Sequence, residues 1–349
     1  MNTYGSRKLL CSNWNANCTA DPTRFDASFK HHALITLRIT TALVLCILLS
    51  PSTSYSDTRT PIIVTTTGML GDTIRNLVQE HAHVQHLMRS GVDPHMYKPT
   101  RDNIASLLKA DLIFLNGLKL EGRFAHALER IQKVKQNVIA VGDLLNPLLL
   151  HAPEEYTKAY DPHIWMDPIL WKEVTRIISD SLITHFPNME SVIRKNTNNY
   201  LSQLDELNAF ASDSIRLIPE RKRVLVTAHD AFHYFGTRYR VRVIGIQGIS
   251  TESEAGIRDI KGIVSQLIER EVPAVFIEST VSDRNVRAIR EGSEAQGHTV
   301  QLGGTLFSDA MGEEGTPEGT YIGMIKHNIT TFVTAMRKEP NQSHKEDLS

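Results

Sequence analysis

The chain has 349 residues, 38 Lys and Arg against 39 Asp and Glu, and a formal net charge of -1. Because there is no excess of basic residues to neutralise phosphates, nucleic acid is not an expected partner. With 41% hydrophobic and 22% charged residues the chain has a globular composition, which excludes collagen-like, coiled-coil and disordered proteins, and its length allows roughly two domains.

The cysteines all lie near the N-terminus, at Cys11, Cys18 and Cys46. The body of the chain therefore offers no thiolate for a disulfide framework, a cysteine metal site or a cysteine nucleophile. Any metal or catalytic site there must be built from carboxylates and from the imidazoles of the 15 histidines.

The N-terminal region predicts export. Residues 39–49 form an uncharged apolar run after basic residues; the run is shorter than the ~20 residues of a spanning helix and fits the hydrophobic part of a signal peptide. Small residues at Ser54 and Ser56 predict a mature chain that begins near Asp57. We therefore interpret residues 1–56 as a signal peptide with an over-extended N-terminus.

Two alternatives remain for this region. The apolar run could be a buried or anchoring helix instead of a cleaved one. Cys46 also lies in a sequence that resembles a lipoprotein box, although Leu45 is not the small residue expected before a lipidated cysteine. The expected location is periplasmic, and a protein anchored on the outer side of the membrane is the alternative.

Residues 57–187 read as a first α/β lobe. From Pro61 onward, short apolar runs alternate with longer amphipathic ones. This order is that of repeated βαβ units, which predicts a parallel sheet flanked by helices. Strands are predicted at 62–67, 83–88, 112–117 and 137–142, and helices at about 70–80, 101–110 and 121–133.

Residues 220–349 repeat the same pattern as a second α/β lobe. Strands are predicted at 224–228, 241–246, 274–279 and 298–303, and helices near 255–271, 283–296 and 319–337. The predicted fold class is α/β, with two lobes that each contain a four-stranded, mainly parallel sheet flanked by helices.

Residues 188–219 are expected to connect the lobes. No Gly or Pro occurs between Met189 and Ile218, which predicts one continuous helix of ~45 Å and hence a stiff connection with little hinge motion. An ordinary surface helix of one lobe is the alternative. The apolar or near-apolar positions of this segment recur at helical spacing: Ile193, Thr197, Tyr200, Leu204, Leu207, Ala211 and Ile215.

The tripeptide Asp-Pro-His occurs twice, and it ends at His95 and at His163. Each copy lies in a proline-bounded segment beyond strand-like sequence, where loops present side chains at the carboxyl ends of parallel strands. Taken singly, each of these histidines is more often a capping or surface residue than a ligand.

The second lobe adds His229, directly after a predicted strand, and Asp309. All four side chains are expected to point into one crevice if the lobes face each other. Three neutral imidazoles and one carboxylate suit Zn²⁺, Mn²⁺ or Fe²⁺. Their separations along the chain match no local zinc motif, so the residues alone do not establish the site.

Several blocks of the sequence resemble the metal-binding receptors of ABC importers, the TroA-like solute-binding family (cluster A-I). They are GVDPHMYKPTRDNIASLLKADLIFLNG, DPHIWMDP, RVLVTAHDAFHYFGTRYRVRVIGIQGISTESEAG, VFIEST and LFSDAMGEEGTPEGTYIGMIKHNI. The resemblance covers residues 61–337 and implies two lobes joined by a rigid helix. It implies the metal ligands His95, His163, His229 and Asp309.

The resemblance also implies a function. One divalent transition metal ion is the cargo, the partner is an ABC permease in the cytoplasmic membrane, and the protein is a monomer and not an enzyme. Zinc-dedicated members carry a His- and acid-rich loop before the second ligand, whereas this chain has only His151, Glu154 and Glu155 there. A histidine as third ligand, where many manganese and iron receptors have Glu, favours zinc. Zinc and manganese both remain candidates, with iron as a third.

Residues near the expected ligands have two interpretations each. His233 is a spare ligand or a solvated helix position. Glu278 is a hydrogen-bond partner of a ligand imidazole or a partnered structural carboxylate. An apolar wall that excludes water is expected from Trp165, Met166, Tyr97 and Phe232.

A metal-dependent hydrolase is the rival class of function. Catalysis requires three protein ligands, an open position and a general base, whereas four protein ligands fill a tetrahedral site and favour capture. A surface adhesin on the same fold is a third possibility, and no residue of the sequence argues for or against it. Because imidazoles must be neutral to bind metal, affinity is expected to weaken as the pH falls through about 6 to 5.

Overall fold

The computed structural model describes residues 59–135, 137–153 and 159–337. By its internal contacts the chain divides at Thr58, and the described residues all belong to the unit that begins at Arg59. The predicted signal peptide, Cys46, Glu154 and Glu155 lie outside the described residues. None of the helices formed by the described residues combines the length and the apolar character that a membrane span requires.

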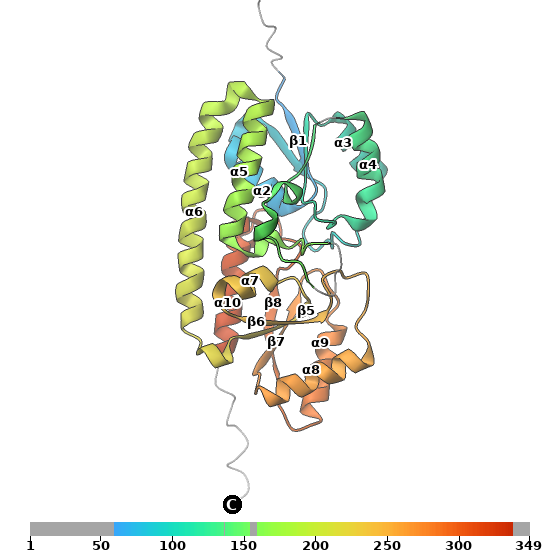
Figure 1. Ribbon diagram of the computed structural model, residues 1–349, viewed down its shortest axis with the longest axis vertical. Coiled ribbons are helices and arrows are strands. Elements are labelled where there is room, and N and C mark those ends of the chain that lie inside the picture. Colours follow the sequence, from blue (N-terminus) through green and yellow to red (C-terminus); the bar gives the residue numbers. More distant parts are fainter. Residues whose placement is uncertain (1–58, 136, 154–158, 338–349) are drawn as a thin grey trace, which may run out of the picture. The chain divides into compact units, whose positions relative to one another are not determined.

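The first lobe is built on a parallel sheet with the strand order β2-β1-β3-β4. Ile63 and Val64 of the central strand are both fully buried, because helices cover both faces of the sheet. Figure 1 shows α2 on one face, and α3 and α4 on the other. The elements are β1 (Ile62–Thr65), α2 (Gly68–Val78), β2 (His83–His86), α3 (Arg101–Lys109), β3 (Leu112–Leu115), α4 (Ala125–Val134) and β4 (Val138–Ala140).

The second lobe is also a parallel α/β unit, but its strands are hydrogen-bonded as two pairs, β5 with β6 and β7 with β8. Its elements are β5 (Val224–His229), α7 (His233–Tyr239), β6 (Arg242–Gln247), α8 (Ile257–Glu269), β7 (Ala274–Glu278), α9 (Arg284–Glu294), β8 (Gln301–Leu306) and α10 (Tyr321–Arg337). The prediction of two parallel α/β lobes is confirmed, and the division of the second sheet into pairs is an additional feature.

Strand β8 begins three residues later than the predicted 298–303, and it continues through Gly303 and Gly304. A side chain at Gly303 is excluded because its Cβ would lie 2.4 Å from the ring of Phe276 on the paired strand. Gly303 therefore marks a close approach of β7, and Gly304 a close approach of α10, both inside the strand.

The segment between the lobes is helical. Helix α6 (Glu190–Arg216) has 27 residues and is therefore about 40 Å long, and all seven positions predicted for its apolar stripe are buried. It runs along both lobes, next to α5 (Pro168–His185) and α10 (Figure 1). Helix α5 was not predicted; its start is marked by Asp167, whose carboxylate caps the first turn, and by Pro168 at the first helical position.

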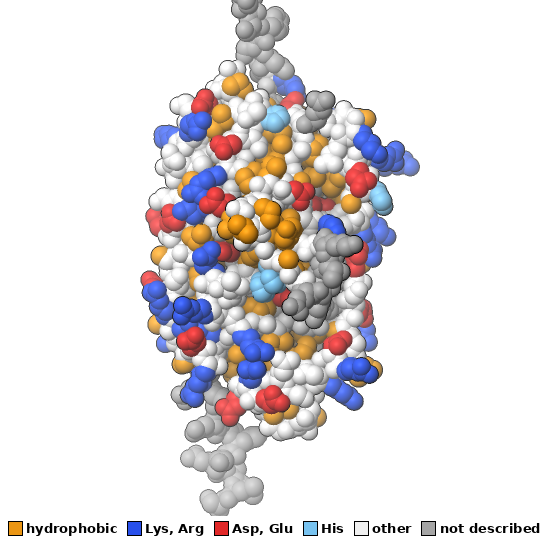
Figure 2. Space-filling view, in the orientation of Figure 1, with side chains coloured by type: hydrophobic (Ala, Val, Ile, Leu, Met, Phe, Trp, Pro, Cys, Tyr) orange, Lys and Arg blue, Asp and Glu red, His pale blue; other side chains and the backbone are white. Residues whose placement is uncertain are grey.

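One hydrophobic core joins the two lobes along α5, α6 and α10. At its centre the rings of Trp171 and Tyr321 stack with their centroids 5.2 Å apart, and both residues are fully buried. On the outside, positive and negative side chains are interspersed on the face drawn in Figure 2, in agreement with the near-zero net charge.

Candidate metal centre

The structure brings the four predicted ligands together. His95, His163, His229 and Asp309 each offer one ligand atom, and these atoms lie within 4.8 Å of one another. His95 is in the loop between β2 and α3, and His163 directly precedes a 3₁₀ turn before α5. His229 is the last residue of β5, and Asp309 follows β8. Each lobe therefore contributes two of the four groups.

The imidazoles all present their Nε2 atoms to the centre of this cluster. Nε2 of His163 lies 3.3 Å from Nε2 of His95 and 3.3 Å from Nε2 of His229. The Asp309 oxygens complete the arrangement, with Oδ1 3.3 Å from His163 Nε2 and Oδ2 3.3 Å from His229 Nε2. A tetrahedral site with metal–ligand bonds of about 2.0–2.1 Å has edges of about 3.3–3.4 Å. The two edges between histidine Nε2 atoms and one edge from a histidine to either Asp309 oxygen have the length that a four-coordinate zinc ion requires, whereas His95 Nε2 lies 4.0 Å from Asp309 Oδ2.

A carboxylate lies behind each imidazole. The backbone N–H groups of His95, His163 and His229 donate to the side chains of Asp93, Asp161 and Glu278, at 2.8, 2.9 and 2.9 Å respectively. Two of these carboxylates also reach the ring: Asp161 Oδ1 lies 2.7 Å from Nδ1 of His163, and Glu278 Oε2 lies 2.5 Å from Nδ1 of His229. A carboxylate at Nδ1 holds the proton there and leaves Nε2 free as a ligand.

In the repeated Asp-Pro-His tripeptide the aspartate also has a role, which is to hold the histidine in position. In both copies the aspartate accepts the backbone N–H of the histidine two residues later, which fixes the turn that presents the imidazole. Glu278 was expected to be either a hydrogen-bond partner of a ligand imidazole or a structural carboxylate. The structure shows the first, because Glu278 accepts a hydrogen bond from the ring of His229.

Burial and mutual attraction set the charge state of the cluster. Burial is the main reason that the pKa of His95 is lowered to about 3. Burial alone would also lower the pKa of His163, but Asp161 and Asp309 outweigh it and raise this pKa to about 9. In the same way Glu278 and Asp309 overcome burial and raise the pKa of His229 well above its usual value. The two imidazolium charges hold the pKa of Asp309 well below its ordinary range despite complete burial.

The donor set fits a bound cation. Both carboxylate oxygens of Asp309 are buried and lack a well-formed hydrogen bond in the described part of the chain. A buried carboxylate without hydrogen bonds is costly unless a cation compensates it. Without an ion, the charged rings of His163 and His229 compensate the carboxylate. A divalent ion between three neutral imidazoles and this carboxylate would take over that compensation.

Other predicted residues lie around the cluster. Trp165 is fully buried, with its ring centroid 5.3 Å from that of His163, so it forms part of the expected apolar wall. Tyr97 packs instead against Phe124 in the first lobe. His233 is outside the ligand cluster and stacks on His151, with a centroid distance of 3.4 Å.

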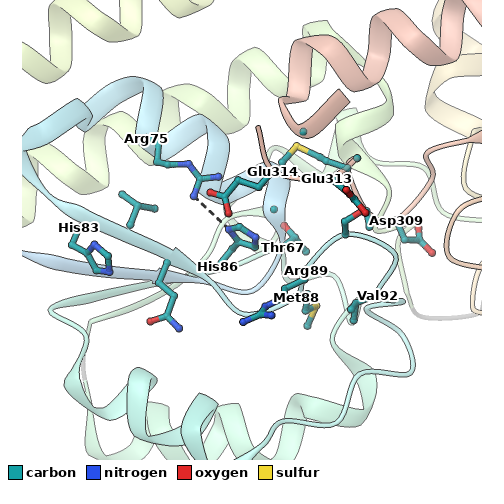
Figure 3. Close-up of a pocket in the computed structure, with 18 residues that line it drawn as sticks. Thr67, Arg75, His83, His86, Met88, Arg89, Val92, Asp309, Glu313 and Glu314 are labelled. Atoms are coloured by element: carbon teal, nitrogen blue, oxygen red, sulfur yellow. Dashed lines mark hydrogen bonds between the residues drawn. The ribbon is translucent and has the colours of Figure 1, made fainter. Parts of the chain in front are cut away.

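A cavity of about 530 Å³ adjoins the cluster, between α2, β2 and the segment that follows β8 (Figure 3). Arg75, His86 and Glu314 are among the side chains that line it, and Asp309 contributes to its wall. The Asp309 side chain nevertheless has 0% exposure. The cavity therefore does not open onto the carboxylate.

Comparisons with known proteins show the family to which the chain is related. Residues 63–335 match the model of the family described as zinc-uptake complex component A, periplasmic. The zinc-binding protein TroA of Treponema pallidum is 41% identical over 278 residues, which cover 80% of this chain and 89% of the relative. The manganese-binding lipoprotein MntA of Bacillus subtilis is 41% identical over 275 residues, covering 79% and 89%.

Solved structures show the same fold. The periplasmic zinc-binding protein TroA from Treponema pallidum superposes with a TM-score of 0.78 at 40% identity, over 80% of this chain and 100% of the other. Fe(III)-bound YtgA from Chlamydia trachomatis superposes with a TM-score of 0.70 at 27% identity, over 79% and 98%.

Proposed function

We propose that the chain captures one divalent transition metal ion and delivers it to an ABC permease. It belongs to the family of periplasmic zinc-uptake components, and the metal receptor TroA is among its relatives. His95, His163, His229 and Asp309 are the proposed ligands. The observation that carries the proposal is the set of four donor groups from two lobes, whose ligand atoms lie within 4.8 Å of one another and are closed off from solvent.

The geometry favours capture over turnover. Hydrolysis at a metal needs an open coordination position for water and a general base beside it. Here the side chains of His163, His229 and Asp309 have 0% exposure and that of His95 has 4%. A cluster this enclosed gives a substrate no access to the ion, which supports a receptor and not a metal-dependent hydrolase.

The proposed cargo is zinc or manganese, with iron as a third candidate. One relative is described as a zinc-binding protein and another as a manganese-binding protein, and one similar solved structure holds Fe(III). The 3.3 Å edges between the histidine Nε2 atoms are compatible with zinc. Affinity in vitro will not identify the biological cargo, because zinc binds more tightly than manganese at most nitrogen and oxygen sites.

We further propose that the protein acts outside the cytoplasm, with residues 1–56 removed as a signal peptide. The apolar run at 39–49 supports export, as do relatives described as periplasmic or as lipoproteins. Anchoring on the outer side of the membrane is the alternative. Because one chain supplies the whole donor set, a monomer is sufficient for binding.

The test is equilibrium dialysis of the chelator-stripped protein against zinc, manganese and iron(II), beside the His163→Ala variant. One tightly bound equivalent that is lost in the variant is the expected result. His233→Ala is the matched control, since this histidine lies four residues from His229 but outside the cluster. Absence of tight binding by the unmodified protein, or equal binding by His163→Ala, would refute the proposal.

A further inference from the structure

Metal exchange at the proposed site requires the protein to open. Three of the four proposed ligand side chains have no exposed surface, and only His95 retains 4%. An ion must therefore pass on the side of His95, and the lobes or loops there must separate first. The contacts that hold this side closed therefore set the rate at which the ion is exchanged.

On the opposite side, two buried hydrogen bonds and one partly exposed ion pair connect the lobes. The indole N–H of Trp165 donates to the carbonyl of Ser308 at 2.7 Å, and the hydroxyl of Tyr321 donates to the carbonyl of Trp165 at 2.8 Å. Arg238 and Asp167 form an ion pair at 2.7 Å. These contacts belong to the same region as the core that both lobes share, so this side cannot part without breaking the core.

On the side of His95, the lobes are connected through the loop between β6 and α8, residues 248–256. The hydroxyl of Thr251 donates to Oδ2 of Asp93 across the boundary, at 2.6 Å. Next to it, Arg123 and Glu252 form an ion pair at 3.2 Å. Figure 1 places α8, which this loop precedes, on the opposite side of the molecule's second lobe from α6.

The two contacts differ in strength. Arg123 and Glu252 have side-chain exposures of 36% and 48%, and an ion pair so exposed to water contributes little. The Thr251–Asp93 hydrogen bond is partly buried, short and made to a carboxylate, which is the stronger class of hydrogen bond. The carboxylate of Asp93 also accepts the backbone N–H of His95 at 2.8 Å. Opening at Thr251 is thus coupled to the turn that presents a proposed ligand.

We propose that the hydrogen bond from Thr251 to Asp93 is a clasp that closes the metal site, and that its opening controls the rate at which the ion is loaded and released. The inference rests on the proposed function of the site. Thr251 and Asp93 act here as positioning residues, because neither contributes a ligand atom to the cluster.

This role has a kinetic signature. Because Thr251 does not touch the ion, its hydrogen bond stabilises the closed form equally with and without cargo, so weakening it raises the open population of both forms by the same factor. Association and dissociation rate constants then increase together, while the dissociation constant stays the same. A residue that only aligned His95 would instead change the dissociation constant.

The experiment is stopped-flow kinetics with zinc on the Thr251→Val variant, which removes the hydroxyl and keeps the β-branched shape. Loading is followed by the fluorescence of Trp165, whose ring lies 5.3 Å from that of His163, and release by transfer to a chromogenic chelator. We expect both rate constants to rise about tenfold, which corresponds to roughly 1.4 kcal/mol, with the dissociation constant unchanged within about twofold.

Two variants complete the test. Thr251→Ser retains the hydroxyl and is expected to retain the original rates, and Glu252→Gln removes only the exposed ion pair and is expected to change them less than about twofold. Unchanged rates in Thr251→Val would overturn the clasp, and so would a rise in the dissociation rate alone. If the unmodified protein bound no zinc, the proposed function itself would fail, so the two failures are distinguishable.

Discussion

Binding of the ion should release protons at neutral pH, and the extent of this release can be worked out from the cluster. The raised pKa values of His163, at about 9, and of His229 mean that these two neighbouring imidazoles together hold between one and two protons on their Nε2 atoms at pH 7 when no ion competes, whereas His95, with a pKa of about 3, is neutral. A metal ion can bind Nε2 only after that proton has left. Between one and two protons per ion are therefore expected to be released.

The same pKa values also determine how metal affinity changes with pH. Because the two pKa values are raised, protons compete more strongly as the pH falls, so metal affinity decreases on acidification. The competition begins near pH 9, and not only at the pH of 6 to 5 expected from an unperturbed imidazole, since Asp161, Glu278 and Asp309 stabilise the charged rings. Each released proton changes the affinity about tenfold per pH unit, or roughly 1.4 kcal/mol.

Isothermal titration calorimetry with zinc at pH 7, in buffers with different ionisation enthalpies, measures the number of protons directly. A plot of the observed enthalpy against the buffer enthalpy should have a slope that corresponds to one to two protons, and the affinity should keep rising between pH 6.5 and 8.5. Release of no protons at pH 7, together with an affinity that is flat over this range, would refute the charge state derived for the cluster.

Other substitutions have expected outcomes as well. Asp309→Ala should lower zinc affinity by more than about 100-fold in dialysis and leave cooperative unfolding of the ion-free protein intact, because the side chain is a proposed ligand without a well-formed hydrogen bond. Glu278→Gln should lower the affinity about 10- to 100-fold, since it removes the charge behind His229; an unchanged affinity would show that hydrogen bonding alone suffices. Trp171→Ala should lower the free energy of unfolding by about 3–5 kcal/mol in denaturant titrations, because it empties the core shared by the two lobes, and a loss below about 1 kcal/mol would contradict that assignment.

Much of the architecture could be predicted from local pattern. Alternating apolar and amphipathic runs predicted the order of strands and helices, and an uninterrupted stripe of apolar positions predicted α6, because both depend on the periodicity of neighbouring residues. Strand β8 was placed too early, since the strand continues past Gly303, where the close ring of Phe276 leaves no room for a side chain, and past Gly304, which has a positive φ.

The sequence by itself determined the identity of the candidate ligands, through motifs whose residue types suit a divalent cation. Only the tertiary structure decided that they meet at one centre, which carboxylates orient them and which contact closes the site. His229 and Glu278 are 49 residues apart, and Asp93 and Thr251 are 158 residues apart. The first pair depends on how β5 and β7 pack within the second lobe, and the second pair depends on how the two lobes pack against each other. The periodicity of a single segment carries no information on either packing.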